Sequence, residues 1–368
     1  MAKPLLLLLH GIGSHSTSWA NDVIARLGEI AGTFPAIAAR GPLSSQVEIK
    51  PLQYDSVFEA QLERWRQNGS RVTGFTTDSA IKVPSLITFL NGALVPTDEE
   101  SFVWNAVMDA VTYRGVGITR DEIRTHVMKE VVSAINAHLA SQPGADISIL
   151  GHSLGTIVTH DVLHLLGSGK GGAAFKSTKF RFTNVFLLAN ASLLGPKKFR
   201  DIDSHDSLTR PVGAPAPSAG GKPCCGSFYN INNHWDPIGS WARFRPSNTW
   251  GDRSHDIEVR HIHQVNVHGI NHYIEHPRVH IALLRALLGS DTIPGRVEDE
   301  RLIAFKDLKP SPCGDAIATL MNTLDRIRNN VSGGDFDDVA TGMLSMYRAV
   351  REAKDRCPAM FNSADGVL

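Results

Sequence analysis

The sequence predicts an α/β protein with a doubly wound, mostly parallel sheet, and three observations lead to this fold class. Residues 4–10 form a continuous apolar run, which is typical of a central strand covered on both faces. Further short runs of strand character follow it, and segments of helical periodicity lie between them. Strands that alternate with helices form parallel sheets.

Six segments have the length and composition of strands. They are residues 4–10, 46–54, 146–150, 181–189, 227–232 and 257–267. The first of them is too short for a signal peptide and leads into His10-Gly11 without a small-residue cleavage site. We therefore interpret it as a buried strand.

Two strong helices are expected around the third of these strands. A capping-box pattern begins at Thr119, and apolar residues then recur every four positions as far as Leu139, before Pro143 and Gly144. The second helix begins at the turn of Ser153 and has one apolar stripe that ends at Gly167.

The predicted domain organisation is one large α/β domain, residues 1–290, and a carboxy-terminal extension, residues 291–368. The extension contains two amphipathic patterns separated by glycines, which predict a helical hairpin. Its sequence does not specify a protein partner. Within the first domain, residues 55–117 are an insertion with several apolar clusters. They predict either a lid over a site or an insertion that packs on the domain.

Composition limits the class of protein. The chain has 368 residues, of which 42% are hydrophobic, and 37 basic residues balance 37 acidic ones. No excess charge attracts the chain to nucleic acid, so we expect no nucleic-acid partner. The 4 cysteines have neither zinc-ligand nor disulfide-framework spacing, and no apolar run reaches membrane-spanning length. A soluble, cytoplasmic protein is expected.

The strongest motif is Gly151-His152-Ser153-Leu154-Gly155, because it lies between an apolar strand and an amphipathic helix. A serine on so sharp a turn has strained backbone angles and close neighbours, and glycines on both sides remove side chains that would clash. The amino terminus of the following helix favours developing negative charge. This context predicts a nucleophilic serine.

A second motif, His10-Gly11-Ile12-Gly13, directly follows the first strand. Together with the motif around Ser153 it resembles the α/β-hydrolase superfamily, particularly its esterases, lipases and thioesterases, over about residues 4–288. The resemblance implies that the amides of Ile12 and Leu154 form the oxyanion hole.

The same resemblance implies the chain order serine, acid, histidine. We choose Asp236 as the acid, because it follows a late strand. Asp203, Asp206 and Asp256 are the alternatives.

Seven histidines follow Asp236. His272 is the predicted base, because its segment resembles the family's late histidine loop before the last core helix, and His268 is the alternative. His261 and His263 alternate on a predicted strand and suggest a metal site, but no third ligand has a fitting spacing.

The expected function is therefore hydrolysis of a carboxylic ester, on a small-molecule or lipid substrate, through an acyl-enzyme. No cofactor is required. A thioesterase or an acyltransferase would use the same residues, and a catalytically silent binding module is an alternative of another class. Membrane contact is expected only for a lipase acting at an interface, with residues 84–104 as an exposed amphipathic segment.

Overall fold

The computed structural model describes residues 2–11, 18–54, 56–57, 60, 117–167, 181–192, 225–236, 243–246, 248–261, 268–306, 318–320, 322–323, 325–326, 349, 352–353 and 355–356. Nearly all of the insertion at 55–117, and of the extension beyond residue 306, lies outside these residues. The predictions of a lid and of a helical hairpin therefore remain predictions.

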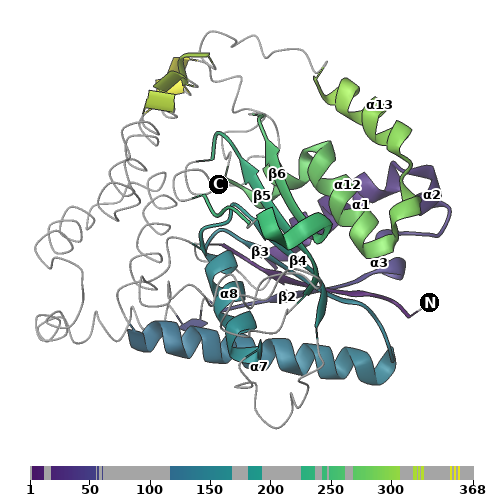
Figure 1. The fold of residues 1–368 in the computed structure, drawn as a ribbon, viewed down its shortest axis with the longest axis vertical. Helices are drawn as coiled ribbons and strands as arrows, with labels where there is room; N and C mark the ends of the chain where they lie inside the picture. Colours follow the sequence, from purple (N-terminus) through teal and green to yellow (C-terminus); the bar gives the residue numbers. More distant parts are fainter. Residues whose placement is uncertain are drawn as a thin grey trace, which may run out of the picture.

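The described chain forms a six-stranded sheet with the order β2-β1-β3-β4-β5-β6 (Figure 1). All neighbouring strands run parallel. The strands are β1 (Leu5–Leu9), β2 (Glu48–Leu52), β3 (Ile147–His152), β4 (Phe182–Leu188), β5 (Cys225–Asn233) and β6 (Ser254–Val259). The predicted α/β class with a parallel sheet is confirmed, although β6 begins and ends earlier than the 257–267 expected from the sequence.

Helices cover both faces of this sheet (Figure 1). On one face lie α7 (Gly117–Ser141) and α8 (Leu154–Gly167), the two helices predicted around β3. The other face is covered by α1 (Ala20–Gly32), α11 (Ile270–Glu275) and α12 (Pro277–Leu288). The other helices whose bounds the structure describes are α2 (Pro35–Ala38), α3 (Leu43–Gln46) and α13 (Gly295–Lys306), with 3₁₀ turns at Asn248–Arg253 and Ser290–Thr292.

The leucines of β1 show why the first strand is continuously apolar. Leu5, Leu7 and Leu9 pack in the core beneath α7 and α8, whereas Leu6 and Leu8 pack in the core beneath α1 and α12. Each fully buried leucine stabilises the fold by about 1.5–3 kcal/mol. Both faces of β1 are therefore covered, and none of its five positions is polar.

The strand order changes direction at β1. From β1 the chain passes to β2 on one side, and then returns to β3 on the other side. In open parallel sheets, ligands bind outside the carboxyl ends of the strands at such a switch point. His10 and Gly11 follow β1 there, and Ser153 follows β3. The strand order therefore places both sequence motifs where open parallel sheets bind their ligands.

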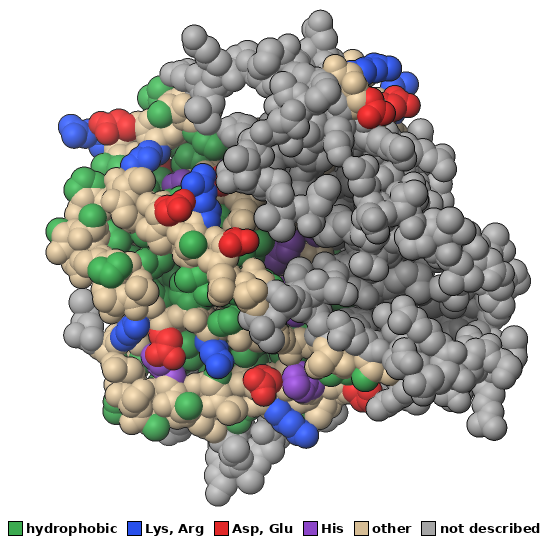
Figure 2. All heavy atoms as spheres, turned by 180° about the vertical axis from the view of Figure 1, so that it is seen from behind, with side chains coloured by type: hydrophobic (Ala, Val, Ile, Leu, Met, Phe, Trp, Pro, Cys, Tyr) green, Lys and Arg blue, Asp and Glu red, His purple; other side chains and the backbone are tan. Residues whose placement is uncertain are grey.

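The described surface is mixed in charge. In the view of Figure 2, acidic and basic side chains of the described residues are interspersed, without a large patch of one sign. Ile303, which is 61% exposed, is the exposed large hydrophobic residue among them. No helix in the described ranges combines the length and the apolarity that crossing a membrane requires.

Candidate active site

Ser153 lies on a strained turn between β3 and α8. Its φ is 56°, in the left-handed region that residues with a side chain rarely adopt. The backbone N–H of Ser153 donates to the carbonyl oxygen of Leu188 at 3.0 Å, so the turn is held against the end of β4. The turn is specified by tertiary packing, because a strand and a helix converge on it.

The flanking glycines are required by close backbone approach. A Cβ on Gly155 would lie 2.3 Å from the carbonyl oxygen of His10, and one on Gly151 would lie 2.7 Å from the carbonyl oxygen of Gly155. Both distances are shorter than a non-bonded carbon–oxygen contact can be, and a backbone oxygen, unlike a side chain, cannot rotate away. The Gly-x-Ser-x-Gly pattern is thus explained by the space around the turn.

The loop after β1 touches the serine directly. A Cβ on Gly11 would lie 2.7 Å from the Cβ of Ser153. The hydroxyl of Tyr54 donates to the carbonyl oxygens of His10 and Gly11, at 2.7 and 3.1 Å. The ring of His10 stacks on that of Tyr54, with centroids 4.2 Å apart. Tyr54 therefore fixes the backbone that borders Ser153.

The two predicted oxyanion donors differ in what the structure describes. Ile12 lies outside the described residues. Leu154 is the first residue of α8 and is buried. The first amides of a helix have no acceptor within the helix, and the helix dipole is positive at this end. The amide of Leu154 is thus suited to binding an anionic oxygen.

Asp236 and His268 form a buried pair. Asp236, three residues beyond β5, is 0% exposed, and its Oδ2 lies 2.8 Å from Nδ1 of His268. Tyr273 also donates its hydroxyl to Oδ2, at 2.6 Å. The structure thus places the alternative histidine, and not the predicted His272, in a hydrogen bond with the chosen acid.

The environment keeps Asp236 ionised. Complete burial acts to raise the pKa of its carboxyl. The attraction of His268 when it is protonated, the hydrogen bonds from His268 and Tyr273 and the attraction of His152 when it is protonated outweigh burial, so this pKa lies below its ordinary value. An ionised carboxylate can only accept hydrogen bonds. Nδ1 of His268 is therefore the donor, and Nε2 of the neutral imidazole carries a lone pair.

Two buried polar atoms of the candidate residues have no hydrogen-bond partner in the part of the chain that the structure describes. Ser153 Oγ and His268 Nε2 are both buried, and neither has a partner among the described residues. His152, which precedes the serine, reaches the carbonyl oxygen of His268 with its Nε2 at 2.6 Å. The nucleophile candidate and the base candidate are thus connected through one side chain. Buried polar groups without partners are rare and call for a functional explanation.

His272 makes a different set of contacts. It lies inside α11 and is fully buried. Its ring stacks on His261 with centroids 4.0 Å apart, and its Nδ1 lies 3.5 Å from Nδ2 of Asn233. These contacts are those of a packed core residue.

The other sequence alternatives are also located in part. Asp203, Asp206 and His263 lie outside the described residues. Within the described ranges, no three His, Cys, Asp or Glu side chains are arranged to hold a metal ion.

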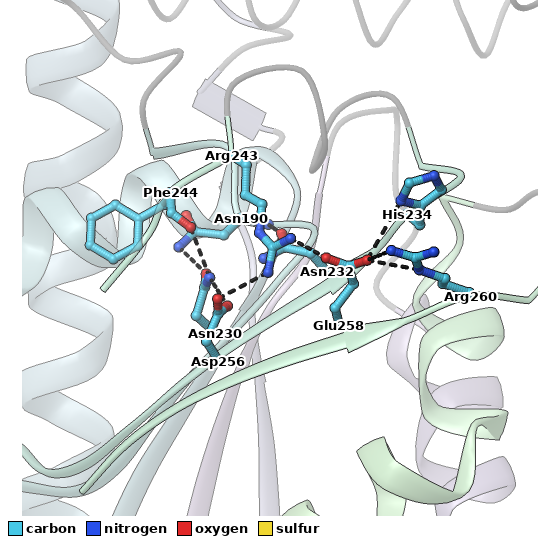
Figure 3. Close-up of polar contacts among 9 residues, drawn as sticks. All are labelled: Asn190, Asn230, Asn232, His234, Arg243, Phe244, Asp256, Glu258 and Arg260. Carbon is cyan, nitrogen blue, oxygen red and sulfur yellow. Dashed lines mark hydrogen bonds and ion pairs between the residues drawn. The ribbon is translucent and has the colours of Figure 1, made fainter. Parts of the chain in front are cut away.

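Asp256 belongs to a polar network that joins β5 and β6 (Figure 3). Its carboxylate accepts from Nδ2 of Asn230 at 2.7 Å and from Arg243 at 2.9 Å. Arg243 also pairs with Glu258, which is the next residue on the same face of β6. Asp256 is therefore engaged in linking strands. Of the two candidate acids that the structure describes, Asp236 is the one with a hydrogen bond to a histidine.

Comparison with known proteins gives no assignment. No protein-family model matches the chain, and no curated protein matches its sequence. The class that the structure defines is an α/β protein with a parallel six-stranded sheet.

Proposed function

We propose that this chain is a serine hydrolase of the α/β-hydrolase type that cleaves a carboxylic ester, with Ser153 as nucleophile, His268 as base and Asp236 as acid. The observation that carries the proposal is the buried Asp236–His268 hydrogen bond, 2.8 Å long, at the strand ends where Ser153 lies on its strained turn. His268 replaces His272 in this assignment.

The reaction follows from the hydrogen-bond directions. His268 Nε2 accepts the proton of Ser153 Oγ while Oγ bonds to the substrate carbonyl carbon. The carbonyl oxygen becomes an oxyanion, to which the amide of Leu154 donates, and we expect the amide of Ile12 to do the same. Collapse breaks the ester bond, and the alcohol leaves with the proton held by His268. Water then releases the acid by the same steps, and no cofactor takes part.

Asp236 has a supporting role in these steps. It accepts from Nδ1 of His268 and so holds the imidazole with Nε2 available. When Nε2 takes a proton, the imidazolium lies beside a carboxylate that is already ionised. Because both groups are buried, their attraction is stronger than it would be in water. The pair thus makes the serine a better nucleophile at neutral pH.

The test is labelling of the full chain by a fluorophosphonate probe, with mass spectrometry to locate the label. We expect label on Ser153 of the wild type and none on Ser153→Ala. His268→Gln should slow labelling on the order of 10³-fold or more. Hydrolysis of aryl esters of increasing chain length then identifies the preferred acyl group.

The matched control is His272→Gln, which changes a buried histidine four residues away. At equal folded fraction, judged by circular dichroism, His272→Gln should label much faster than His268→Gln. The reverse order would restore the base assignment to His272. A folded wild type that neither labels nor hydrolyses any ester would contradict the proposed function.

A further inference from the structure

Tyr273 lies at the centre of the Asp236 environment but takes no part in the reaction steps described above. It is the fourth residue of α11 and is fully buried. Its Oη is 2.6 Å from Asp236 Oδ2 and 3.0 Å from the backbone nitrogen of Asn233. Asn233 is the last residue of β5. One hydroxyl therefore connects the end of the strand with the acid that follows it.

The direction of both bonds can be deduced. The backbone N–H of Asn233 can only donate, so the hydroxyl of Tyr273 accepts that hydrogen bond through a lone pair. A phenol has a single hydrogen, and Tyr273 is therefore free to direct it to Asp236. Burial and the charge of Asp236 raise the pKa of Tyr273 well above its ordinary value, so the hydrogen stays on the phenol.

Tyr273 and His268 donate to the same oxygen. Nδ1 of His268 and Oη of Tyr273 both lie within 2.8 Å of Oδ2 of Asp236. Each of the two donors stabilises part of the negative charge on this oxygen. The hydrogen bond from Tyr273 therefore weakens the attraction of the carboxylate for a proton on the neighbouring imidazole. His268 and Tyr273 belong to one segment of the chain, the turn before α11 and α11 itself.

The turn that carries Asp236 is fixed by the same contact. The N–H of Asp236 donates to the carbonyl oxygen of Asn233 at 3.0 Å, which closes a four-residue turn. Within it, the N–H of Trp235 donates to Oδ1 of Asn233 at 3.2 Å. Tyr273 contacts both ends of this turn. It therefore limits the rotation of the carboxylate as well as sharing its charge.

We propose that Tyr273 is a positioning residue of the Asp236–His268 pair, which orients the carboxylate and sets the proton affinity of the imidazole. This inference rests on the proposed function for its catalytic consequence only. Among the residues that the structure describes, the charged and titratable groups that act on Asp236 are His268 in the turn before α11, Tyr273 on α11 and His152 at the end of β3. Replacement of the Tyr273 hydroxyl therefore alters one of three groups.

The experiment compares Tyr273→Phe with wild type by nuclear magnetic resonance of selectively ¹⁵N-labelled histidine, with His268→Gln used to assign the His268 signals. Wild-type His268 should show a protonated Nδ1 and a bare Nε2. In Tyr273→Phe the titration midpoint of His268 should rise by about 0.5–1 pH unit, because Asp236 regains the charge that Tyr273 shared. An unchanged midpoint in a folded variant would overturn the inference.

The matched control is Tyr229→Phe. Tyr229 lies on β5, the strand that leads to Asp236, and its ring stacks on those of Phe186 and His255 at 4.6 and 4.5 Å. Its replacement removes a phenol hydroxyl from the same strand and should leave the His268 midpoint unchanged. A shift as large as that of Tyr273→Phe would attribute the effect to general loosening and would also overturn the inference.

A second measurement serves if Tyr273→Phe does not fold. Incorporation of 3-fluorotyrosine keeps the shape of Tyr273 but makes its hydroxyl a stronger donor, so the midpoint of His268 should fall. An unchanged or raised midpoint contradicts the inference.

Labelling rates distinguish failure of this inference from failure of the proposed function. If wild type labels with fluorophosphonate, Tyr273→Phe should label about tenfold more slowly at pH 7 than wild type, and the acid limb of its pH profile should move to higher pH. A uniform loss at every pH, with the limb unmoved, indicates a structural role only. If wild type does not label but His268 titrates as expected, the proposed function fails and the inference about Tyr273 stands.

Discussion

Nε2 of His152 lies 2.6 Å from the backbone carbonyl oxygen of His268. A carbonyl oxygen can only accept, so the imidazole of His152 is the donor. The rings of the two histidines are also close, with centroids 4.8 Å apart. The residue before the candidate nucleophile thus holds the backbone of the candidate base, and β3 is joined to the turn that precedes α11.

Replacement of His152 by leucine should therefore misplace His268. We expect His152→Leu to slow fluorophosphonate labelling about tenfold, in line with the loss of one buried hydrogen bond. The control is His138→Leu, because Nε2 of His138 likewise donates to a carbonyl oxygen, that of Lys3, at 2.8 Å before β1 and so at the other end of the sheet. Equal slowing by both variants, per folded molecule, would show that the effect is not local.

Gly155→Ala should destabilise the protein. The new Cβ would lie 2.3 Å from the carbonyl oxygen of His10, and the two backbones would have to separate. We expect the free energy of unfolding in urea to fall by about 3 kcal/mol. Gly28→Ala is the control, since its Cβ would meet nothing within 4 Å. In α1 this change should raise the free energy of unfolding by up to about 1 kcal/mol. Unaltered stability of Gly155→Ala would refute the packing account of the motif.

Tyr54→Phe removes the hydroxyl that donates to the carbonyl oxygens of His10 and Gly11, at 2.7 and 3.1 Å. Two buried acceptors lose a partner, so we expect the free energy of unfolding to fall by about 1–3 kcal/mol. Labelling of Ser153 should also slow, because Gly11 borders the serine. Thermal denaturation and labelling rates check both effects. A variant that is less stable but labels at the wild-type rate would limit Tyr54 to a structural role.

His280 should make stability depend on pH below neutrality. Burial, aided by the charges of Arg301 and Arg26, lowers the pKa of His280 from 6.5 to about 4. Between these values the unfolded chain binds a proton that the folded chain does not, so this contribution to stability is present above pH 6.5 and is lost as pH falls toward 4.

The measurement for His280 is urea unfolding at several pH values. Wild type should lose up to about 3 kcal/mol of unfolding free energy across this interval through His280. His280→Gln, which cannot titrate, should show a shallower decline. Parallel curves for the two proteins would exclude His280 as a source of the acid sensitivity.

The parallel sheet and its flanking helices could be predicted because the pattern of each element has one cause. Leu5 to Leu9 are apolar at every position since both faces of β1 are covered, and the four-residue spacing of α7 follows from its single buried face. The position of Ser153 could also be predicted, because close backbone approach demands the glycines on either side of it.

The histidine could not be chosen from the sequence in the same way. His268 and His272 are only four residues apart, and the hydrophobic pattern of the sequence does not show that a helix begins between them. In the structure Gly269 is the N-cap of α11. His268 therefore precedes the helix and reaches Asp236, whereas His272 is carried into the core against His261. A glycine as a helix N-cap directly after a histidine was the available signal, and it was weaker than the resemblance that favoured His272.

The candidate residues are far apart in the chain, with Ser153 after β3, Asp236 after β5 and His268 before α11. During synthesis from the amino terminus, the ribosome therefore releases the serine long before its base. Under the proposed assignment, a nascent chain that ends before His268 contains the nucleophile without any group to activate it. Reactivity of Ser153 thus arrives only when the segment that contains His268 has been synthesised and placed against Asp236, so probe labelling also reports the folding of this segment.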